Sequence, residues 1–368
     1  MRQGWEYKKF VDCLETAPKA KQVQTSEYGV GSKYPIVSQE DKLVSGYCDD
    51  ASLLCHFDKP VVIFGDHTRV LKYVDFDFVV GADGVKILIP KDFLQAKTLL
   101  YYLQWYNIPS LGYSRHYKLL KELSIPIPSL SEQQSIIAEL DKINELISLK
   151  KSQLNDLDAL AQSIFYDMFG DPVVNEKGWE IKKLGEVFEI GTGSTPERKK
   201  SDRYYGGRVC WVKTTEVHNC DIYETEEKIT DIALEETNCS IYPIDTILMA
   251  MYGQGKTRGQ IARLRTEAAT NQACAAILPN RSVCNVDYLY QFLHVSYEHI
   301  REIGRGGTQP NMNLSLVKSI RFPHPPLPLQ QSFATKVEKI EAEKQHVKQS
   351  LKDLETLLAS RMQYWFDN

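Results

Sequence analysis

The chain has 368 residues, of which 43% are hydrophobic and 25% are charged, as in soluble globular proteins. This composition excludes a disordered chain, a collagen-like fibre and a small disulfide-bonded scaffold, and the length favours two or three domains. The net charge of −4 neither indicates nor excludes a nucleic-acid ligand, because such binding depends on a basic face rather than on the total charge.

The chain shows no sign of a membrane segment, a signal peptide or a metal site. No apolar run approaches the ~18 residues that a membrane helix needs. The opening MRQGWEYKKFVDC is polar and aromatic, unlike a signal peptide, so we expect a cytoplasmic protein. None of the eight cysteines forms a C-x-x-C pair, which favours free thiols over a zinc site.

Residues 1–128 are predicted to form a mixed α/β domain. Short apolar runs at 60–64, 76–80 and 85–89 predict buried strands, and 93–105 predicts a helix. We expect one curled sheet followed by a helix and a loop. Basic and aromatic residues alternate in the loops, and such side chains can hold phosphates and contact base edges. The candidate DNA-binding residues of this domain are Lys33, His67, Arg69, Arg115, His116 and Lys118.

Residues 129–172 are predicted to form a long helix. Apolar residues recur here at alternating steps of three and four, the heptad pattern of a coiled-coil seam. The segment has no internal proline, and its helical part spans about 58 Å at 1.5 Å per residue. The predicted seam residues are Leu140, Ile143, Ile147, Leu154, Leu157 and Ile164.

Residues 173–323 are predicted to form a second mixed domain, with strands at 208–213, 246–252 and 273–278 and a helix over 286–303. Again we expect a curled sheet and a loop that leads into a helix. The candidate DNA-binding residues here are Arg198, Lys199, Lys200, Arg203, Lys213, Lys256, Arg258, Arg305, Gln309 and Asn311.

The segment 250–257, AMYGQGKT, matches a loose nucleotide-binding loop pattern. Such a loop needs a helix directly after it, whose N-terminus faces the phosphates. The next residues, 258–265, alternate polar and apolar like a strand, so we favour a basic β-loop that binds a phosphate backbone through Lys256, Arg258, Arg263 and Arg265. No other catalytic or cofactor motif is evident, and this absence favours a binding protein.

Residues 324–368 are predicted to form a second long helix, and they complete an internal repeat. Gly4-Trp5-Glu6 returns as Gly178-Trp179-Glu180, and Gln133-Gln134-Ser135 returns as Gln330-Gln331-Ser332. The seam residues of this helix are Val337, Ile340, Val347, Leu351, Leu354 and Leu358.

The order domain, helix, domain, helix predicts an antiparallel pair, because the two seams can cover each other while all connections stay short. The predicted fold class is therefore α+β, with two globular α/β domains joined by two long antiparallel coiled-coil helices in a pseudo-two-fold repeat.

The motifs in both halves resemble the specificity subunit of type I restriction-modification systems, and the resemblance covers essentially the whole chain. In each half they resemble a target recognition domain of that family, although the first junction, GYSRHY, lacks the Thr-Gln-Pro-Asn form of the second. The matching segments are 35–37, 46–47, 62–69 and 81–86 in the first half and 191–196, 204–207, 211–213, 247–253, 270–273, 306–311 and 320–323 in the second.

The resemblance implies a subunit that is not catalytic by itself. Each recognition domain would read one half of an asymmetric, bipartite DNA target, and the helices would set the spacer and dock methyltransferase subunits. The chain would carry no cofactor; the methyltransferase subunits would use S-adenosylmethionine, and the restriction subunits ATP and Mg²⁺. The alternatives are a nucleotide-binding enzyme that uses the 250–257 loop and a coiled-coil scaffold without a DNA ligand.

Overall fold

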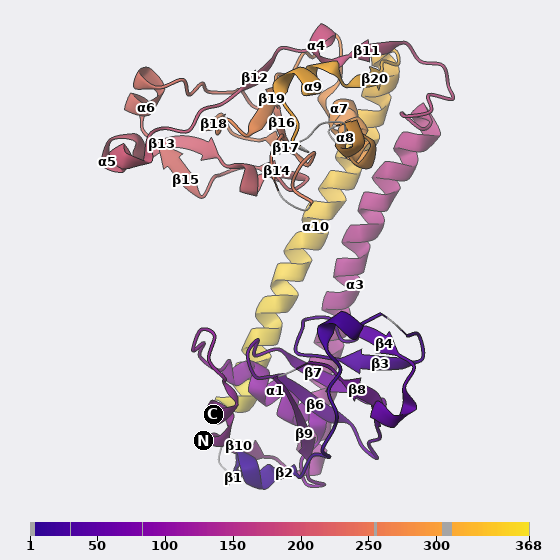
Figure 1. Ribbon diagram of the computed structural model, residues 1–368, viewed down its shortest axis with the longest axis vertical. Helices are drawn as coiled ribbons and strands as arrows, with labels where there is room; N and C mark the ends of the chain where they lie inside the picture. Colours follow the sequence, from indigo (N-terminus) through magenta and orange to yellow (C-terminus); the bar gives the residue numbers. More distant parts are fainter. Residues whose placement is uncertain (1–3, 30, 83, 254–255, 304–310, 368) are drawn as a thin grey trace. The chain divides into compact units, whose positions relative to one another are not determined.

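A computed structural model describes residues 4–29, 31–82, 84–253, 256–303 and 311–367 of the chain. They form two compact units, which are described separately. Unit 1 contains residues 1–152 and 348–368, and unit 2 contains residues 153–347. Each unit therefore combines one α/β domain with one part of each long helix (Figure 1). No helix in the described part of the chain is long and apolar enough to span a membrane.

The described α/β domain of unit 1 contains two four-stranded sheets and a two-stranded ribbon. The first sheet has the order β2 (Leu14–Glu15), β9 (Val85–Pro90), β6 (Val61–Gly65), β7 (Leu71–Val74), and all its neighbours are antiparallel. The second has the order β4 (Gly46–Cys48), β3 (Tyr34–Val37), β8 (Phe78–Val80), β5 (Leu54–Cys55). The ribbon pairs β1 (Glu6–Lys9) with β10 (Ser124–Ile127), which closes the domain before the long helix.

Helix α1 (Ala96–Tyr106) packs on the first sheet of unit 1 and links it to the long helices. Its buried residues share one apolar core with β6 and with Ile136, Leu140, Met362 and Phe366 of the helix pair. The short α2 (Tyr117–Lys121) precedes β10. Burial of these aromatic and aliphatic side chains removes a large apolar area from water, which holds the domain on the helices.

Unit 2 repeats this plan with a larger α/β domain. A five-stranded sheet has the order β12 (Ile190–Thr192), β19 (Cys274–Ile277), β16 (Ile247–Ala250), β17 (Ile261–Leu264), β14 (Cys220–Ile222). An outer sheet has the order β15 (Glu227–Ile229), β13 (Tyr205–Val212), β18 (Ala268–Thr270), and β11 (Ile181–Lys183) pairs with β20 (Arg321–Pro323). Its helices are α4 (Leu184–Val187), α5 (Ser201–Tyr204), α6 (Asp231–Glu236), α7 (Val286–Val295), α8 (Tyr297–Ile303) and α9 (Leu314–Ser319).

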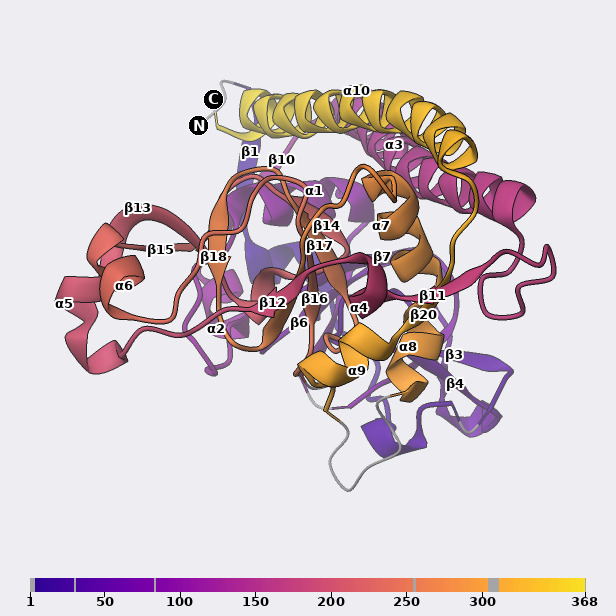
Figure 2. The same cartoon turned by 90° about the horizontal axis from the view of Figure 1, so that it is seen from above.

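The long helices are α3 (Leu130–Phe169) and α10 (Leu327–Phe366), each of 40 residues. In unit 1 Glu139 of α3 accepts hydrogen bonds from Arg361 and Trp365 of α10. In unit 2 Lys344 of α10 bonds to Asp158 of α3 at 2.7 Å. Early α3 thus meets late α10, and late α3 meets early α10, so the helices are antiparallel (Figures 1 and 2).

The predicted seam faces the partner helix and the domain cores. In unit 1 Leu140, Ile143 and Ile147 are buried, and in unit 2 Ile340 and Val347 are buried. The remaining seam positions are half-buried, whereas most residues on the other faces are exposed. These half-buried positions are Leu154, Leu157, Ile164, Val337, Leu351, Leu354 and Leu358.

A buried glutamine fixes each domain to the first turns of its long helix. In unit 1 the Gln133 side-chain amide donates to the carbonyl oxygens of Phe93 and Pro128, and its oxygen accepts the backbone N–H of Gln95 at 2.8 Å. In unit 2 Gln330 makes the corresponding bonds, to the Pro325 carbonyl and from the Asn285 N–H, each at 2.8 Å. The acceptor for the N–H of the N-cap residue of α1 and of α7 therefore comes from the long helix, which gives the repeated glutamine of the Gln-Gln-Ser motif a structural role in both units.

The predicted fold class is confirmed, with local corrections. Among the described residues each domain has two sheets and a terminal ribbon rather than one curled sheet; the added strands, such as β4, β5, β14 and β15, have two or three residues each and are too short to show a pattern in the sequence. The helix predicted over 286–303 is interrupted at Ser296, where α7 ends and α8 begins. The strand predicted over 76–80 begins at Phe78, because Asp77 accepts bonds from His56 and Phe57.

Candidate nucleic-acid interface

In unit 1 His116 anchors a loop instead of facing solvent. Its side chain is fully buried; Nε2 accepts the Leu111 N–H at 2.9 Å, and Nδ1 lies 2.9 Å from the Asp66 carbonyl oxygen. Because Nε2 accepts the Leu111 N–H, Nδ1 is the ring nitrogen that donates, to the Asp66 carbonyl oxygen. The assignment of His116 as a DNA-contacting residue was therefore wrong: the imidazole uses both nitrogens within the fold.

The turn between β6 and β7 is also held by internal bonds. Arg69 adopts a left-handed backbone conformation with φ 62°, and its guanidinium donates to the Ile108 carbonyl at 2.8 Å. The backbone N–H of His67 donates to the Gln39 side chain, and the His67 ring is half-buried. This turn brings His67 close to the β8–β9 connection, where the His67 ring approaches Gly84.

Three candidates of unit 1 remain exposed cations. Lys33, Arg115 and Lys118 are exposed, and none of these side chains forms an ion pair among the described residues. A cation outside an ion pair needs no bond broken before it can bind a phosphate. Lys33 lies just before β3, and Arg115 and Lys118 lie at the start of α2, so the three come from two separate segments.

In unit 2 most candidates on the outer sheet are bound to carboxylates. Arg198 forms a bidentate pair with Glu227 and lies over the Tyr205 ring at 4.3 Å. Arg203 pairs with Glu236, and Lys213 pairs with Glu226 and Glu227. Lys200 lies 3.4 Å from Glu197, whereas Lys199 is exposed without a partner among the described residues. The hydrogen bonds that Arg198 donates to Glu227 raise the pKa of Arg198 above its usual value, and the paired carboxylates offset the charges of these cations.

Residues 254–255 of the 250–257 motif lie outside the described residues, and the described part of the loop lacks the helix that a nucleotide-binding loop needs. A turn at Lys256–Gly259 leads into strand β17, and no helix follows that could direct its N-terminal N–H groups at a phosphate. Lys256 is exposed, but Arg258 is only 6% exposed. Arg258 was therefore wrongly assigned as a phosphate contact: its guanidinium is enclosed within the fold, although its Nε has no hydrogen-bond partner in the described structure.

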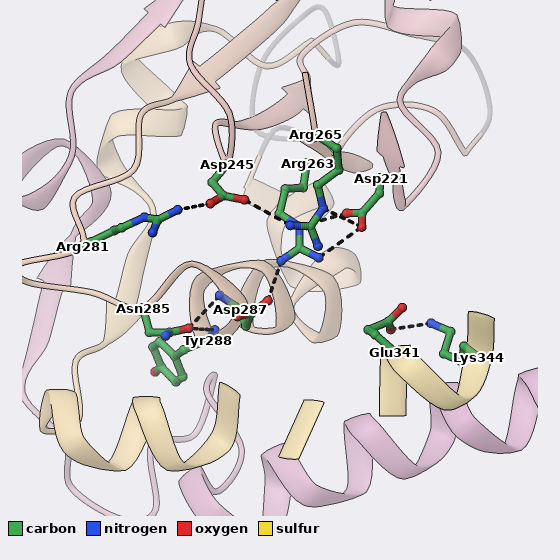
Figure 3. A network of polar contacts seen from close by, with 10 residues as sticks. All are labelled: Asp221, Asp245, Arg263, Arg265, Arg281, Asn285, Asp287, Tyr288, Glu341 and Lys344. Carbon is green, nitrogen blue, oxygen red and sulfur yellow. Dashed lines mark hydrogen bonds and ion pairs between the residues drawn. The ribbon is translucent and has the colours of Figure 1, made fainter. Parts of the chain in front are cut away.

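The predicted basic β-loop is also neutralised at Arg263 and Arg265 (Figure 3). Arg263 is buried between Asp221 at 2.9 Å and Asp287 at 2.5 Å. Arg265 bonds to Asp221 at 2.9 Å and to Asp245 at 3.3 Å. The network ties β14 and β17 to the first turn of α7, and neither arginine is available as a phosphate ligand.

Burial and ion pairing shift the pKa values of Asp221 and Arg263 in opposite directions. Burial alone would raise the pKa of Asp221, but the bonds from Arg263 and Arg265 lower it below the usual value. Burial alone would lower the pKa of Arg263, yet its carboxylate partners raise it above the usual range. Asp221 and Arg263 therefore stay charged at neutral pH, and removal of Arg263 would leave Asp287 without its cation.

Three candidates lie at the junction before α9. Asn311 is exposed in the described chain, whereas Arg305 and Gln309 lie outside the described residues. The candidate set omitted Tyr113, whose side chain is fully exposed beside Arg115. In the sequence Tyr113 follows Gly112 and precedes Ser114 and Arg115. Sequence patterns alone do not distinguish an aromatic residue in such a position from one in the core. No cluster of three His, Cys, Asp or Glu within the described ranges could hold a metal ion.

The family described as type I restriction modification DNA specificity domain matches residues 2–159 and 176–356. The chain belongs to this family. The two matched segments correspond to the two halves of the repeat, each with its α/β domain and most of its long helix.

Similar proteins and solved structures agree with this membership. The EcoR124I/EcoR124II specificity subunit of Escherichia coli is 24% identical over 90% of this chain and 87% of its own length. The MjaIX specificity subunit of Methanocaldococcus jannaschii is 28% identical over 69% of this chain and 64% of its own length.

The crystal structure of a type I restriction-modification S subunit from M. genitalium covers 98% of this chain and 95% of that chain, with TM-score 0.58 and 17% identity. At that identity the likeness supports the fold alone.

Proposed function

We propose that this chain is the sequence-specific DNA-binding subunit of a type I restriction-modification complex. Each recognition domain reads one half of a bipartite, asymmetric target in double-stranded DNA. The helices α3 and α10 set the spacer between the two halves and dock the methyltransferase subunits. The main support is a duplicated frame, which consists in each unit of a buried glutamine of the long helix and a two-stranded ribbon. This glutamine clamp is Gln133 in unit 1 and Gln330 in unit 2, and the two domains above it have different loops.

A repeated frame with different loops fits a reader of two different sequences. Phosphate contacts position a protein on the duplex, and side chains at base edges discriminate between sequences. The junction 112–117 of unit 1, GYSRHY, differs in sequence from the junction 306–311 of unit 2, GGTQPN, so the two half-targets differ. The exposed cations Lys199 and Lys256 supply phosphate contacts for the second domain.

Catalysis belongs to the partners in this proposal. The methyltransferase subunits use S-adenosylmethionine, the restriction subunits use ATP and Mg²⁺, and the complex acts in the cytoplasm. The specificity chain contributes DNA recognition, spacing and the docking surface of its helix pair. This division of labour fits a chain whose polar clusters, such as the network at Arg263, are occupied by internal bonds.

The test is the salt dependence of DNA binding by the full chain. Each phosphate contact contributes about 0.9 to the slope of log K against log salt. The double variant K199A/K256A should bind all duplex sequences more weakly and reduce the slope by about one to two. K348A, an exposed lysine on α10, is the matched control and should leave the slope unchanged. Wild-type protein whose DNA affinity does not depend on salt would contradict the proposal and would favour a scaffold.

A further inference from the structure

The loop 111–115 of unit 1 exposes an aromatic ring that packing does not explain. Tyr113 is fully exposed and Leu111 is partly exposed. Among the described residues, Tyr113 makes no ring contact, hydrogen bond or ion pair. The ring therefore contributes nothing to the apolar core, and an exposed aromatic on a loop is a group available to a ligand.

The base of this loop is fixed from both ends. The Leu111 N–H donates to Nε2 of His116, and the His116 N–H donates to the Asp66 carbonyl at 2.9 Å. The Asp66 carboxylate, itself buried, accepts the Tyr117 N–H at 2.7 Å. The loop thus begins and ends on one buried imidazole, so that little conformational freedom remains to be lost when Tyr113 binds.

The segment that follows the Tyr113 ring is cationic up to position 121. Arg115, Lys118 and Lys121 are the only charged residues between positions 108 and 121, and all three are exposed. Lys86 lies 5.6 Å and Lys121 5.4 Å from the centre of the Tyr117 ring. Asp66, which lies 3.9 Å from Lys86, is 2% exposed and offers no negative charge to a ligand, whereas Glu122, directly after Lys121, is exposed.

A protruding aromatic ring that precedes two exposed cations, Arg115 and Lys118, without an ion pair among the described residues matches the chemistry of double-stranded DNA. Cations hold the phosphates on both sides of a groove, and a ring between them reaches sugars and base edges. An acidic protein partner would also attract the cations, but a single exposed ring on a narrow loop gives such a partner little apolar area to bury. The loop is a short projection and offers no broad apolar surface of the kind that forms protein interfaces.

We propose that Tyr113 is a specificity-determining side chain of the first recognition domain. Its ring enters a groove of the first half-target and packs against base edges, while Arg115 and Lys118 hold the flanking phosphates. His116 is the positioning residue that keeps the ring in place. This inference rests on the proposed function, because it assigns one residue within a DNA-reading domain.

The experiment selects bound duplexes from a pool of randomised sequence with the full chain and sequences them. Wild-type protein should select a motif in two parts. Y113A should keep the second part and the spacer but lose the base preference at one or two pairs of the first part, with about tenfold weaker binding to the wild-type motif. S114A is the control in the same loop and should select the wild-type motif.

Three further variants separate the role of the ring from the roles of its hydroxyl group, the loop and the cations. Y113F keeps the ring and should keep the motif, whereas H116A frees the loop and should lose the same base preference as Y113A. R115A/K118A should weaken binding to every sequence without changing the motif. If Y113A selects the wild-type motif with unchanged affinity, the inference is overturned while DNA recognition stands. If wild-type protein selects no motif, the proposed function itself fails.

Discussion

The candidate DNA-binding cations of the two recognition domains differ in how many of them form ion pairs with carboxylates. In unit 1 Arg115 and Lys118 have no carboxylate partner among the described residues, whereas in unit 2 Arg198 and Arg203 are paired with Glu227 and Glu236. Beneath these surfaces the frame is the same, with a glutamine clamp from the long helix in each unit. The repeat therefore preserves the attachment of each domain to the helices, while the loops of the candidate interface are free to diverge.

A second difference concerns the contact between each domain and its helices. In unit 1 Lys97 of α1 pairs with Asp141 of α3 at 2.5 Å, so that the ion pair joins the domain directly to the long helix. In unit 2 the first turn of α7 carries Asp287, which pairs with Arg263 inside the domain. Both units have an apolar core that includes long-helix residues; unit 2 adds a charge network between its sheet and α7, and unit 1 adds a half-buried ion pair between α1 and α3.

Removal of Arg263 should have the greatest consequence for stability. R263L should lower the free energy of unfolding of unit 2 by about 3–5 kcal/mol, because half-buried Asp287 would lose its cation and half-buried Asp221 would keep Arg265 alone. Urea unfolding combined with hydrogen exchange of α7 measures the loss. R281L is the control, since the Arg281 side chain is 73% exposed and its partner Asp245 keeps Arg265. A loss below about 1 kcal/mol in R263L would show that the network does not hold the sheet.

Replacement of Gln133 or Gln330 tests the frame that the two units share. The expected loss of stability is somewhat smaller than that of R263L. Q133L and Q330L should each lower the stability of their own unit by about 2–4 kcal/mol, because each leaves a buried N–H and one or two buried carbonyl oxygens without partners. Q134L and Q331L change the exposed neighbours and should have little effect. Unequal losses in the two units, measured by hydrogen exchange of α1 and α7, would show that the clamp is not equivalent in the repeats.

A smaller effect is the pH dependence of unit 2. The pKa of Asp221 is lowered in the folded state, so its pairing stabilises the protein above the usual carboxyl pKa of 3.8, and this stabilisation is lost as the pH falls below that value. In R263L Asp221 has lost one of its two arginine partners, so its pKa in the folded state should be lowered less. The free energy of unfolding of R263L should therefore fall less than that of wild type as the pH decreases. Unfolding free energies measured between pH 6 and pH 3 give the difference between variant and wild type. Parallel curves would contradict the assignment.

The frame was more predictable from the sequence than the candidate interface. The seams of α3 and α10 and the strands at β6, β9, β16 and β19 follow from periodicity and apolar runs, because burial imposes those patterns. His116 and Arg258 were misassigned because the sequence shows residue type but not exposure. Arg263 was misassigned because its partners, Asp221 and Asp287, are distant in sequence, and no local pattern reports such a pairing.

A change in helix length tests whether the helix pair measures the DNA target. Seven residues inserted after Leu149 of α3, matched by seven after Asp353 of α10, preserve the seam and lengthen both helices by about 10 Å. Asp353 is the matched site because Lys151 of α3 pairs with Glu355 of α10. If the helix pair sets the spacer, the lengthened protein should select targets whose halves lie about three base pairs further apart, at roughly 3.4 Å per pair. A folded, DNA-binding variant that keeps the original spacer would show that the helices do not set it.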